Sequence, residues 1–277
     1  MKKISLMILM FLLFVFVGCG SSDKINVISR EASSGTRSAF VEMFEILEDG
    51  VDKTTKNAQV TQSTSVVITS VAQNKNSIGY ISLGSLNDTV KAVSIDGVEA
   101  TVANVLSGDY KISRPFNLVY KADLDELSKD FIKFILSKEG QDIINNNNYI
   151  KVSKEEENYV SQKLTGKIVL AGSTSVSPVM EKLADAYKKL NTGVEIEIQQ
   201  SGSSAGITSV SKGICNIGMS SRELKTSELE SGLLYERIAV DGIAVIVNKN
   251  NDILNLTSKQ VKDIFVGNVT SWSELNK

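Results

Sequence analysis

After residue 22 the chain alternates short β-branched segments with helical apolar stripes, and this alternation limits the possible folds more than any other feature. Such a pattern is typical of α/β layers built on a mainly parallel or mixed sheet. We predict strands at residues 25–29, 78–82, 167–171, 195–199 and 243–248. We predict core-facing helical stripes within residues 40–47, 127–135 and 180–190, where apolar residues recur with a 3.6-residue period.

Two segments give less direct signals. In residues 63–73 the β-branched run at 66–68 favours a strand, whereas the hydroxyl run at 63–65 favours a helix cap, and we predict a helix. Residues 145–165 are polar, with four consecutive asparagines and a Lys-Glu-Glu-Glu run, and Gly166 precedes the next predicted strand. This composition predicts a linker at about residues 151–166.

The N-terminus has the form of an export signal. Two lysines precede an almost wholly apolar stretch at residues 4–17, which is short for a membrane span. Cys19 follows Gly18 at the end of this stretch and resembles a bacterial lipobox cysteine, which implies that residues 1–19 form a signal peptide and lipobox and that the Cys19 thiol is lipidated. An uncleaved anchor or a plain signal is the alternative. Cys215 is then expected to be a small buried apolar residue.

Composition excludes several classes of function. The chain has 277 residues, with 30 Lys and Arg against 32 Asp and Glu, so it has no basic excess for binding nucleic acid. It contains no histidine, which removes the usual general base and the commonest metal ligand. Two cysteines cannot form a structural zinc site by themselves. Hydroxyls, amides, arginines and carboxylates must therefore hold any ligand.

Three loops share one design: a predicted strand ends, small hydroxyl residues and glycines follow, and a predicted helix begins. They are residues 171–178 (AGSTSVSP), 200–206 (QSGSSAG) and 30–37 (REASSGTR). Each places free backbone N–H groups and hydroxyls at a helix N-terminus, where the helix dipole favours an anion. Each loop by itself is also explained by ordinary helix capping.

Convergence of the three loops would surround one tetrahedral oxyanion with donors. Arg30 would add a charge-assisted, bidentate contact. An anion that leaves water needs such a full replacement of its hydration shell. Nucleotide binding is disfavoured, because none of the loops contains the lysine of a GxxxxGK[ST] motif.

Four motifs together resemble the phosphate-binding proteins of bacterial phosphate ABC transporters (PstS-type). They are AGSTS at 171–175 with Pro178, QSGSSAG at 200–206, IGMSSR at 217–222 and REASSGT at 30–36, and the resemblance covers nearly everything after Ser22. It implies an α/β, two-lobed periplasmic-binding-protein-like fold (type II), in which each lobe is a mixed sheet flanked by helices and the ligand lies in the cleft between lobes. The implied phosphate-binding residues are Thr174, Ser175, Ser203, Ser221, Arg30, Ser34, Gly35 and Thr36.

The order of these motifs departs from most members of that family. Residues 167–277 resemble the N-terminal part of the family, and residues 25–152 resemble its later part, so the chain looks circularly permuted. Termini that lie close together make such a rearrangement physically tolerable. We then expect residues 111–238 to form the first lobe and residues 20–110 plus 239–277 to form the second. A rearranged gene product that folds poorly is the alternative.

A second departure concerns ligand selectivity. Many relatives carry an acidic residue where this chain has Ser221, and that residue accepts a hydrogen bond from the proton on hydrogen phosphate and repels fully ionised sulfate. A hydroxyl can donate or accept, so it discriminates less. Asp241 is a candidate for the missing acceptor, and a surface or turn carboxylate is the competing interpretation.

The leading hypothesis is therefore a monomeric, extracytoplasmic lipoprotein that captures inorganic phosphate and delivers it to the permease subunits of an ABC importer. Its membrane contact would be the lipid anchor at Cys19, with no metal, no cofactor and no nucleic acid. One alternative is a binding protein for another oxyanion, such as sulfate or molybdate, and another is an anion sensor or surface protein without a transport role. An esterase using Ser175 or Ser34 is disfavoured, because the chain has no histidine and no GxSxG motif.

Overall fold

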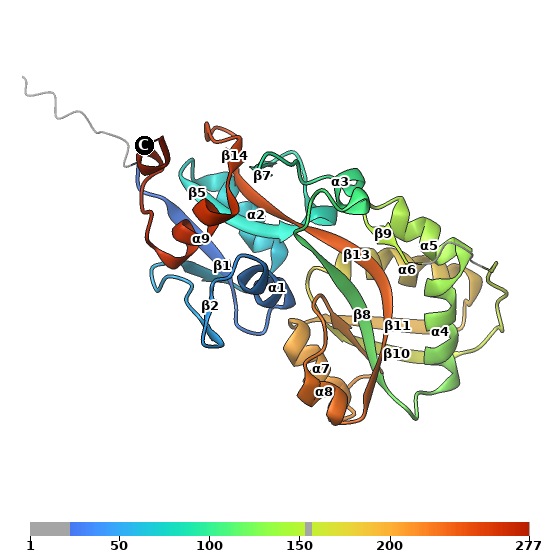
Figure 1. Cartoon of the computed structure of the whole chain (residues 1–277). Helices are drawn as coiled ribbons and strands as arrows, with labels where there is room; N and C mark the ends of the chain where they lie inside the picture. The colour runs from blue at the N-terminus through green and yellow to red at the C-terminus, as the bar shows by residue number, and fades with distance from the viewer. Residues whose placement is uncertain (1–22, 153–156, 277) are drawn as a thin grey trace, which may run out of the picture.

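The computed structural model describes residues 23–152 and 157–276, which form two halves joined by long strands (Figure 1). Among the described residues, ten strands belong to one mixed sheet with the order β11-β10-β12-β8-β13-β5-β1-β4, and β6 and β9 add to β13. The strands on this path are β11 (Val194–Gln200), β10 (Gly166–Gly172), β12 (Ile217–Ser220), β8 (Ser113–Lys121), β13 (Leu233–Asn248), β5 (Ser77–Ser82), β1 (Asn26–Arg30) and β4 (Gln59–Thr61).

The strand β13 belongs to both halves. Its first part pairs antiparallel with β8, and its last part pairs antiparallel with β5, so one continuous strand runs from one half into the other (Figure 1). Its pairing with β8 shifts register between Arg237 and Ala239. Such an irregularity bends a strand locally, which suits a strand that crosses between two packed bodies.

Parallel pairing sets where the loops of each half meet. Strand β1 pairs parallel with β4 and β5, and β10 pairs parallel with β11 and β12. The carboxyl ends of neighbouring parallel strands lie at one edge of a sheet, and ligand-binding loops of α/β proteins gather there. Three loops between a strand and a helix leave such edges, after β1, β10 and β11.

Helices cover the sheet in both halves (Figure 1). The helices are α1 (Gly35–Met43), α2 (Thr64–Gln73), α3 (Val102–Ser107), α4 (Glu126–Leu136), α5 (Lys138–Asn145), α6 (Ser177–Leu190), α7 (Ser203–Ser211), α8 (Thr226–Glu230) and α9 (Ser258–Val266), with 3-10 turns η1 (Leu83–Ser85) and η2 (Trp272–Asn276). The short strands are β2 (Leu47–Glu48), β3 (Val51–Asp52), β6 (Val90–Ala92), β7 (Ser94–Ile95), β9 (Ile150–Lys151) and β14 (Asn255–Leu256).

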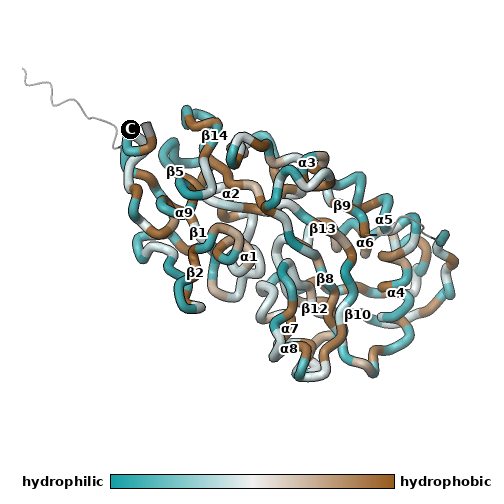
Figure 2. The backbone as a smooth tube through the Cα atoms, in the orientation of Figure 1, coloured by the Kyte–Doolittle hydropathy of each residue, from teal (hydrophilic) through white to brown (hydrophobic). Residues whose placement is uncertain are grey.

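Each half has its own large hydrophobic cluster, and hydrophobic stretches of chain run through both halves (Figure 2). One cluster draws its buried residues from 25–112 and 243–272, together with Ile150. The other draws its buried residues from 116–239. The two-lobed α/β fold is as expected. The expected lobe bounds and the linker at about residues 151–166 remain predictions, and residues 153–156 of that linker lie outside the described residues.

The local predictions are largely confirmed. The ambiguous segment is helical, and the Ser63 hydroxyl caps α2 by accepting from the Val66 amide at 3.3 Å. The prediction that Leu47 and Leu190 lie in the core is wrong, because both are 40% exposed. Leu47 leaves the helix because α1 ends at Met43 and Glu45 takes a positive φ of 52°.

The strand predicted at 243–248 is only the end of β13, which begins at Leu233. Glu236, Arg237 and Asp241 interrupt the apolar pattern of its first part, which hid that part of the strand from sequence analysis.

Of the two predictions about cysteines, the one for Cys215 falls on a described residue and the one for Cys19 does not. Cys215 is a buried free thiol, as predicted, and burial raises its pKa to about 11. It packs in a small cluster beside Ile207 and Val210 of α7. The lipidation prediction at Cys19 and the signal peptide at residues 1–19 lie outside the described residues.

Phe40 links the core of one half to the end of β1, where Arg30 lies. Its ring stacks on Tyr80 with centroids 3.9 Å apart and contacts Phe44 and Phe265, each at 4.7 Å. The Tyr80 hydroxyl in turn accepts from the Arg30 amide at 3.2 Å. Packing behind α1 therefore fixes the backbone from which the Arg30 side chain extends.

We predict that Phe40→Ala lowers the free energy of unfolding by about 3–5 kcal/mol, because it removes a fully buried ring and leaves a cavity. Urea denaturation of protein lacking residues 1–19 measures this. Leu254→Ala is the control, because Leu254 is 68% exposed and should change stability by less than about 0.5 kcal/mol. A loss below about 1 kcal/mol for Phe40→Ala would contradict the packing described here.

Candidate functional site

Strand β10 ends at Gly172, and the loop that follows it depends on this glycine. Gly172 has a φ of 140°, and a Cβ there would lie 2.3 Å from the Met219 carbonyl oxygen, so no larger residue fits. The chain then turns through Ser173, Thr174 and Ser175 into α6, and all three are buried. The Ser173 hydroxyl accepts from the Ser175 amide at 3.2 Å and donates to the Ser221 hydroxyl at 2.8 Å.

The loop after β11 is anchored to the first loop. The amides of Ser201 and Gly202 both donate to the Gly172 carbonyl at 2.9 Å, and Gly202 takes a φ of 86° before α7 begins at Ser203. The Ser203 hydroxyl is fully buried and accepts from the Ser221 amide at 3.1 Å. The second loop therefore brings Ser203 beside Ser221, at the end of β12.

The loop after β1 belongs to the other half. Ser34 caps α1, and its hydroxyl accepts from the Arg37 amide at 3.3 Å. The Arg37 guanidinium donates to the Arg30 carbonyl at 2.6 Å and pairs with Asp52 at 2.7 Å. These contacts fold the loop back on itself and leave Gly35 and Thr36 in the first turn of the helix.

Contacts across the two halves bring the three loops together. The Arg30 Nη2 donates to Thr174 Oγ1 at 3.0 Å, and the hydroxyls of Thr36 and Ser175 lie 2.9 Å apart. The Ser204 amide donates to the Ser33 carbonyl at 3.1 Å. Arg30 and Thr174 are 144 positions apart in the chain, and Thr36 and Ser175 are 139 apart, yet each pair lies at hydrogen-bonding distance.

Gly35 lies at the tightest part of this junction. A Cβ on Gly35 would lie 2.3 Å from the Ser203 hydroxyl oxygen and 2.7 Å from that of Ser221. Only a glycine lets the α1 backbone approach both hydroxyls. The α1 N-terminus therefore faces the loop after β11 and the end of β12 directly.

Arg30 is the one charged side chain among the predicted ligand residues, and it is 2% exposed. Its Nε and Nη2 bind both carboxylate oxygens of Glu31 at 2.8 Å, which fixes the plane of the guanidinium. The remaining donors reach Thr174 through Nη2 and Thr64 through Nη1. Glu31 thus orients Arg30 from one edge, while the other edge faces the hydroxyls.

The predicted residues are gathered in one buried cluster. Arg30, Thr36, Thr174 and Ser175 are linked across the halves by side-chain hydrogen bonds, and Gly35, Ser203 and Ser221 lie against one another. Ser34 is adjacent in sequence and acts as the cap of α1. These positions are compatible with the predicted phosphate-binding roles, which remain predictions.

Sequence reasoning missed three contributors to the cluster: Glu31, Ser173 and Thr64. Glu31 and Ser173 lie inside two of the predicted loops, but their partners depend on the fold. Thr64 is the first residue of α2, and the hydroxyl run at 63–65 did predict that a helix begins there. The hydroxyl run was interpreted only as a helix cap. A helix N-terminus also favours a bound anion, and this pattern could therefore have indicated a ligand contact.

Asp241 is not a surface or turn carboxylate, and that interpretation is wrong. It lies in β13, is 1% exposed and pairs with Arg114 at 3.1 Å. Its other oxygen accepts from the Ser82 hydroxyl at 2.8 Å. Burial raises the pKa of Asp241 and lowers that of Arg114, and their mutual attraction opposes both shifts. Both carboxylate oxygens of Asp241 therefore accept hydrogen bonds inside the protein.

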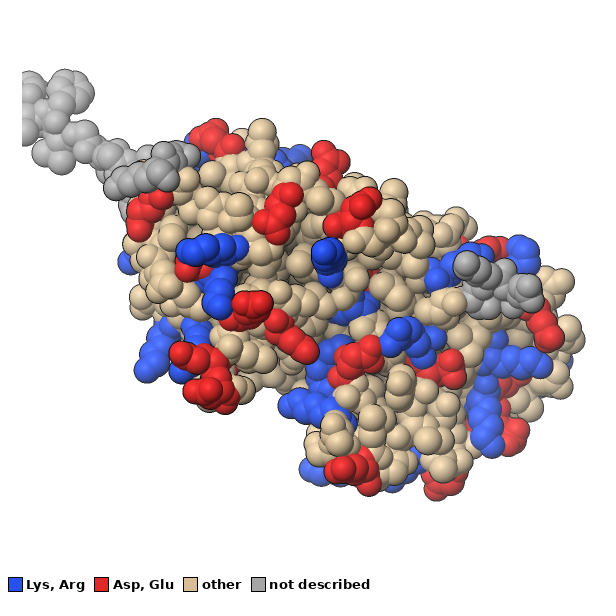
Figure 3. Space-filling view, viewed as in Figure 1, with Lys and Arg blue, Asp and Glu red and all other residues tan. Residues whose placement is uncertain are grey.

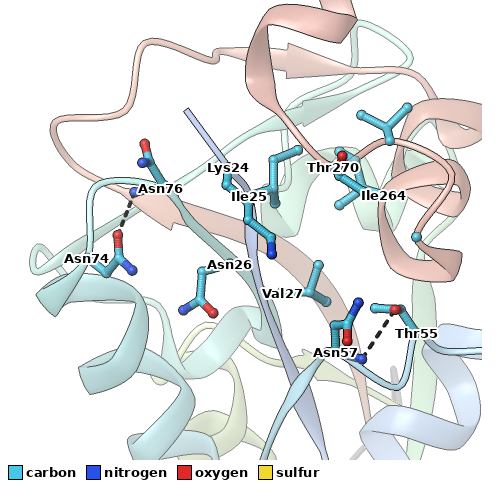
Figure 4. Close-up of a pocket in the computed structure, with 12 residues that line it drawn as sticks. Lys24, Ile25, Asn26, Val27, Thr55, Asn57, Asn74, Asn76, Ile264 and Thr270 are labelled. Carbon is cyan, nitrogen blue, oxygen red and sulfur yellow. Dashed lines mark hydrogen bonds between the residues drawn. The ribbon is translucent and has the colours of Figure 1, made fainter. Parts of the chain in front are cut away.

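Two larger hollows lie outside the cluster, and one of them borders the loop after β1 through Ala32 and Arg37. One of about 820 Å³ opens between the halves, where α1 faces residues 222–226, and forms a notch with charged side chains of both signs along its edges (Figure 3). The other, of about 570 Å³, lies at the start of β1, the opposite end of that strand from Arg30 (Figure 4). Its lining is mostly amide and apolar, with Asn26, Asn74 and Asn76 among its residues.

Comparison with known proteins places the chain in a family. The sequence model of the PBP superfamily domain matches residues 18–139 and 158–277. "Phosphate-binding protein PstS 2" of Streptococcus agalactiae serotype V is 51% identical over 275 residues, which cover 95% of this chain and 94% of that protein. The chain is a member of the PstS family.

Other PstS relatives agree. The PstS 2 protein of Streptococcus pneumoniae serotype 4 is 47% identical over 275 residues, again 95% of this chain and 94% of that protein. A crystal structure of a phosphate-binding protein of a phosphate ABC transporter from S. pneumoniae TIGR4 superposes with a TM-score of 0.74 at 48% identity, covering 91% of this chain and 99% of that one. The permuted order relative to most PstS proteins stays a prediction.

We predict that Arg30→Ala weakens phosphate binding by about 2 kcal/mol or more, because it removes a buried set of charge-assisted donors. Arg30→Lys should restore part of the loss, because it keeps the charge but not the planar fork.

Isothermal titration calorimetry on protein lacking residues 1–19 measures the dissociation constants. Arg237→Ala is the matched control, because Arg237 is 44% exposed and pairs with Glu223 on the surface. An Arg30→Ala affinity equal to that of the control would place Arg30 outside the ligand site.

Proposed function

We propose that this PstS-family chain is an extracytoplasmic solute-binding lipoprotein that captures inorganic phosphate between its two lobes and delivers it to an ABC importer. The observation that carries the proposal is the buried cluster of hydroxyls and helix N-termini around Arg30, to which both halves contribute. A desolvated oxyanion requires many donors and a favourable electrostatic field, and this cluster supplies them through its hydroxyls, its helix N-termini and the Arg30 guanidinium, whose charge Glu31 balances in part.

The proposed ligand residues are Arg30, Ser34, Gly35, Thr36, Thr174, Ser175, Ser203 and Ser221. The direction of the internal hydrogen bonds supports their role as donors. Thr174 Oγ1 accepts from Arg30, and Ser203 Oγ accepts from the Ser221 amide. A hydroxyl whose oxygen already accepts keeps its hydrogen for a further acceptor, such as a phosphate oxygen. The cluster is therefore arranged to donate.

We propose binding without chemistry. The sequence has no histidine, so a serine of this cluster has no imidazole base to activate it as a nucleophile. Serine and threonine hydroxyls that accept from amides and arginine suit reversible coordination of an anion. Energy for transport then comes from an ATPase subunit of the importer, and the two-lobed fold supplies the ligand-dependent hinge motion of periplasmic binding proteins.

Membrane attachment belongs to the same proposal. Within residues 23–152 and 157–276, no helix combines the length and hydrophobicity needed to cross a bilayer. We propose that lipidation of Cys19 anchors the protein at the outer face of the cell membrane, where it meets the permease subunits as a monomer.

A second candidate ligand is another tetrahedral oxyanion, such as sulfate. Ser173 donates to the Ser221 hydroxyl at 2.8 Å, so the Ser221 oxygen is already accepting and its hydrogen is free to donate. A hydroxyl that can donate also suits sulfate, and it lacks the negative charge with which a carboxylate would repel sulfate. The contact therefore favours broader oxyanion binding than a carboxylate at that position would give.

We predict that protein lacking residues 1–19 binds phosphate with one site per chain. Calorimetric titrations with phosphate, sulfate and molybdate compare the two candidate ligands directly. Tighter binding of phosphate supports the leading proposal, and tighter binding of sulfate or molybdate supports the second. An absence of heat with phosphate, together with no phosphate protection against thermal unfolding, would end the phosphate proposal.

We also predict that Ser221→Asp raises the preference for phosphate over sulfate by roughly tenfold, because a carboxylate accepts a hydrogen bond from the O–H of hydrogen phosphate and repels sulfate. Ser221→Ala is the control, because it removes the hydroxyl without adding an acceptor. The ratio of the two dissociation constants at pH 7 is the readout. Equal ratios in Ser221→Asp and the unmodified protein would show that other residues decide selectivity.

A further inference from the structure

We propose that Thr64, at the start of α2, is a further ligand-binding residue that donates its hydroxyl to the bound oxyanion. This inference rests on the anion site proposed above. Thr64 lies outside the three loops that the sequence singled out, and it adds a fourth segment of chain to the site.

The Thr64 hydroxyl lies among the proposed ligand residues. Its oxygen is 3.3 Å from Arg30 Nη1, 3.1 Å from Ser175 Oγ and 3.4 Å from Thr174 Oγ1. The residue is 5% exposed. Two of these three neighbours come from the opposite half of the molecule, so Thr64 occupies the same junction as Arg30 and Thr36.

The sheet topology explains how Thr64 reaches this position. Strand β4 pairs parallel with β1, with Thr61 opposite Arg30. The connection from β4 to α2 therefore leaves the sheet at the same edge as the loop from β1 to α1, which is where parallel strands collect their ligand loops. Three residues after Thr61, Thr64 begins a helix whose N-terminus faces the cluster.

Helix α2 also provides electrostatic support. It has ten residues, and the Ser63 hydroxyl takes up the Val66 amide. The amides of the first turn have no partner within the helix, and the dipole places partial positive charge at this end. An anion near Thr64 therefore meets a favourable field as well as a hydroxyl.

The hydrogen-bond directions leave the Thr64 hydrogen available. Arg30 Nη1 can only donate, so Thr64 Oγ1 accepts in that contact. The Thr64 hydrogen is then left for another oxygen, either Ser175 Oγ at 3.1 Å or an oxyanion that replaces this contact. Thr64 and Thr174 thus both accept from the guanidinium, and each keeps one hydrogen for another oxygen.

Thr64 and Thr174 also line a hollow of about 290 Å³ beside the cluster. The start of α2 forms one wall of this hollow, and Pro178 and Glu181 of α6 lie on the other. Thr64 is therefore placed between this hollow and Arg30, where a small oxyanion held by the guanidinium would contact it.

The test is calorimetric titration of inorganic phosphate into protein lacking residues 1–19, carrying Thr64→Val, Thr64→Ser or Thr69→Val. Valine keeps the shape of threonine and removes the hydroxyl, and serine keeps the hydroxyl. Thr69→Val is the matched control, because Thr69 lies exposed on the same helix and its hydroxyl donates to the Ser65 carbonyl at 3.0 Å.

We expect Thr64→Val to weaken phosphate binding about tenfold, while Thr64→Ser and Thr69→Val stay within about threefold of the unmodified protein. An affinity of Thr64→Val within twofold of the unmodified protein would overturn the proposal. Equal losses in Thr64→Ser and Thr64→Val would also overturn it, because packing would then be the cause. Failure of the unmodified protein to bind any oxyanion would instead refute the proposed function.

Discussion

The contact between Arg30 and Thr174 is the interaction on which the arrangement of the site depends. It joins a guanidinium from the β1 half to a hydroxyl from the β10 half at 3.0 Å, and both side chains are buried. A buried arginine needs both neutralisation and hydrogen-bond partners. Glu31 supplies the charge from one edge, and hydroxyls of both halves occupy the other. The resulting junction can exchange hydroxyl–hydroxyl contacts for contacts to an oxyanion.

The shared strands make this junction compatible with movement of the two halves. Strands β8 and β13 run side by side along the middle of the described molecule, and β13 pairs with β5 in one half and with β8 in the other (Figure 1). The buried pair of Arg114 and Asp241 joins β8 to β13 at this crossing. Removing one partner of a buried ion pair is strongly destabilising, because it leaves an uncompensated buried charge. We interpret this pair as the support that keeps the two halves in register.

Sequence analysis found the fold class, the family and three of the loops, because each depends on local chemistry. Glycines at turns, hydroxyl helix caps and helical apolar stripes can each be recognised within a short stretch of sequence. Gly172, with its positive φ, is one example. Contacts that depend on which strands lie side by side were not predictable from local sequence. Thr64 joins the cluster only because β4 lies beside β1, and Asp241 is buried only because β13 is long enough to pass Arg114.

The central claim is that one anion is held at the junction of the halves by groups from both. A crystal structure of protein lacking residues 1–19, grown with phosphate, tests this most directly. The account predicts a single tetrahedral anion in contact with the Arg30 guanidinium, the Thr174 hydroxyl and the α1 N-terminus. Phosphate bound only elsewhere, for example in the hollow at the start of β1, with Arg30 and Thr174 making no contact to it, would contradict the account.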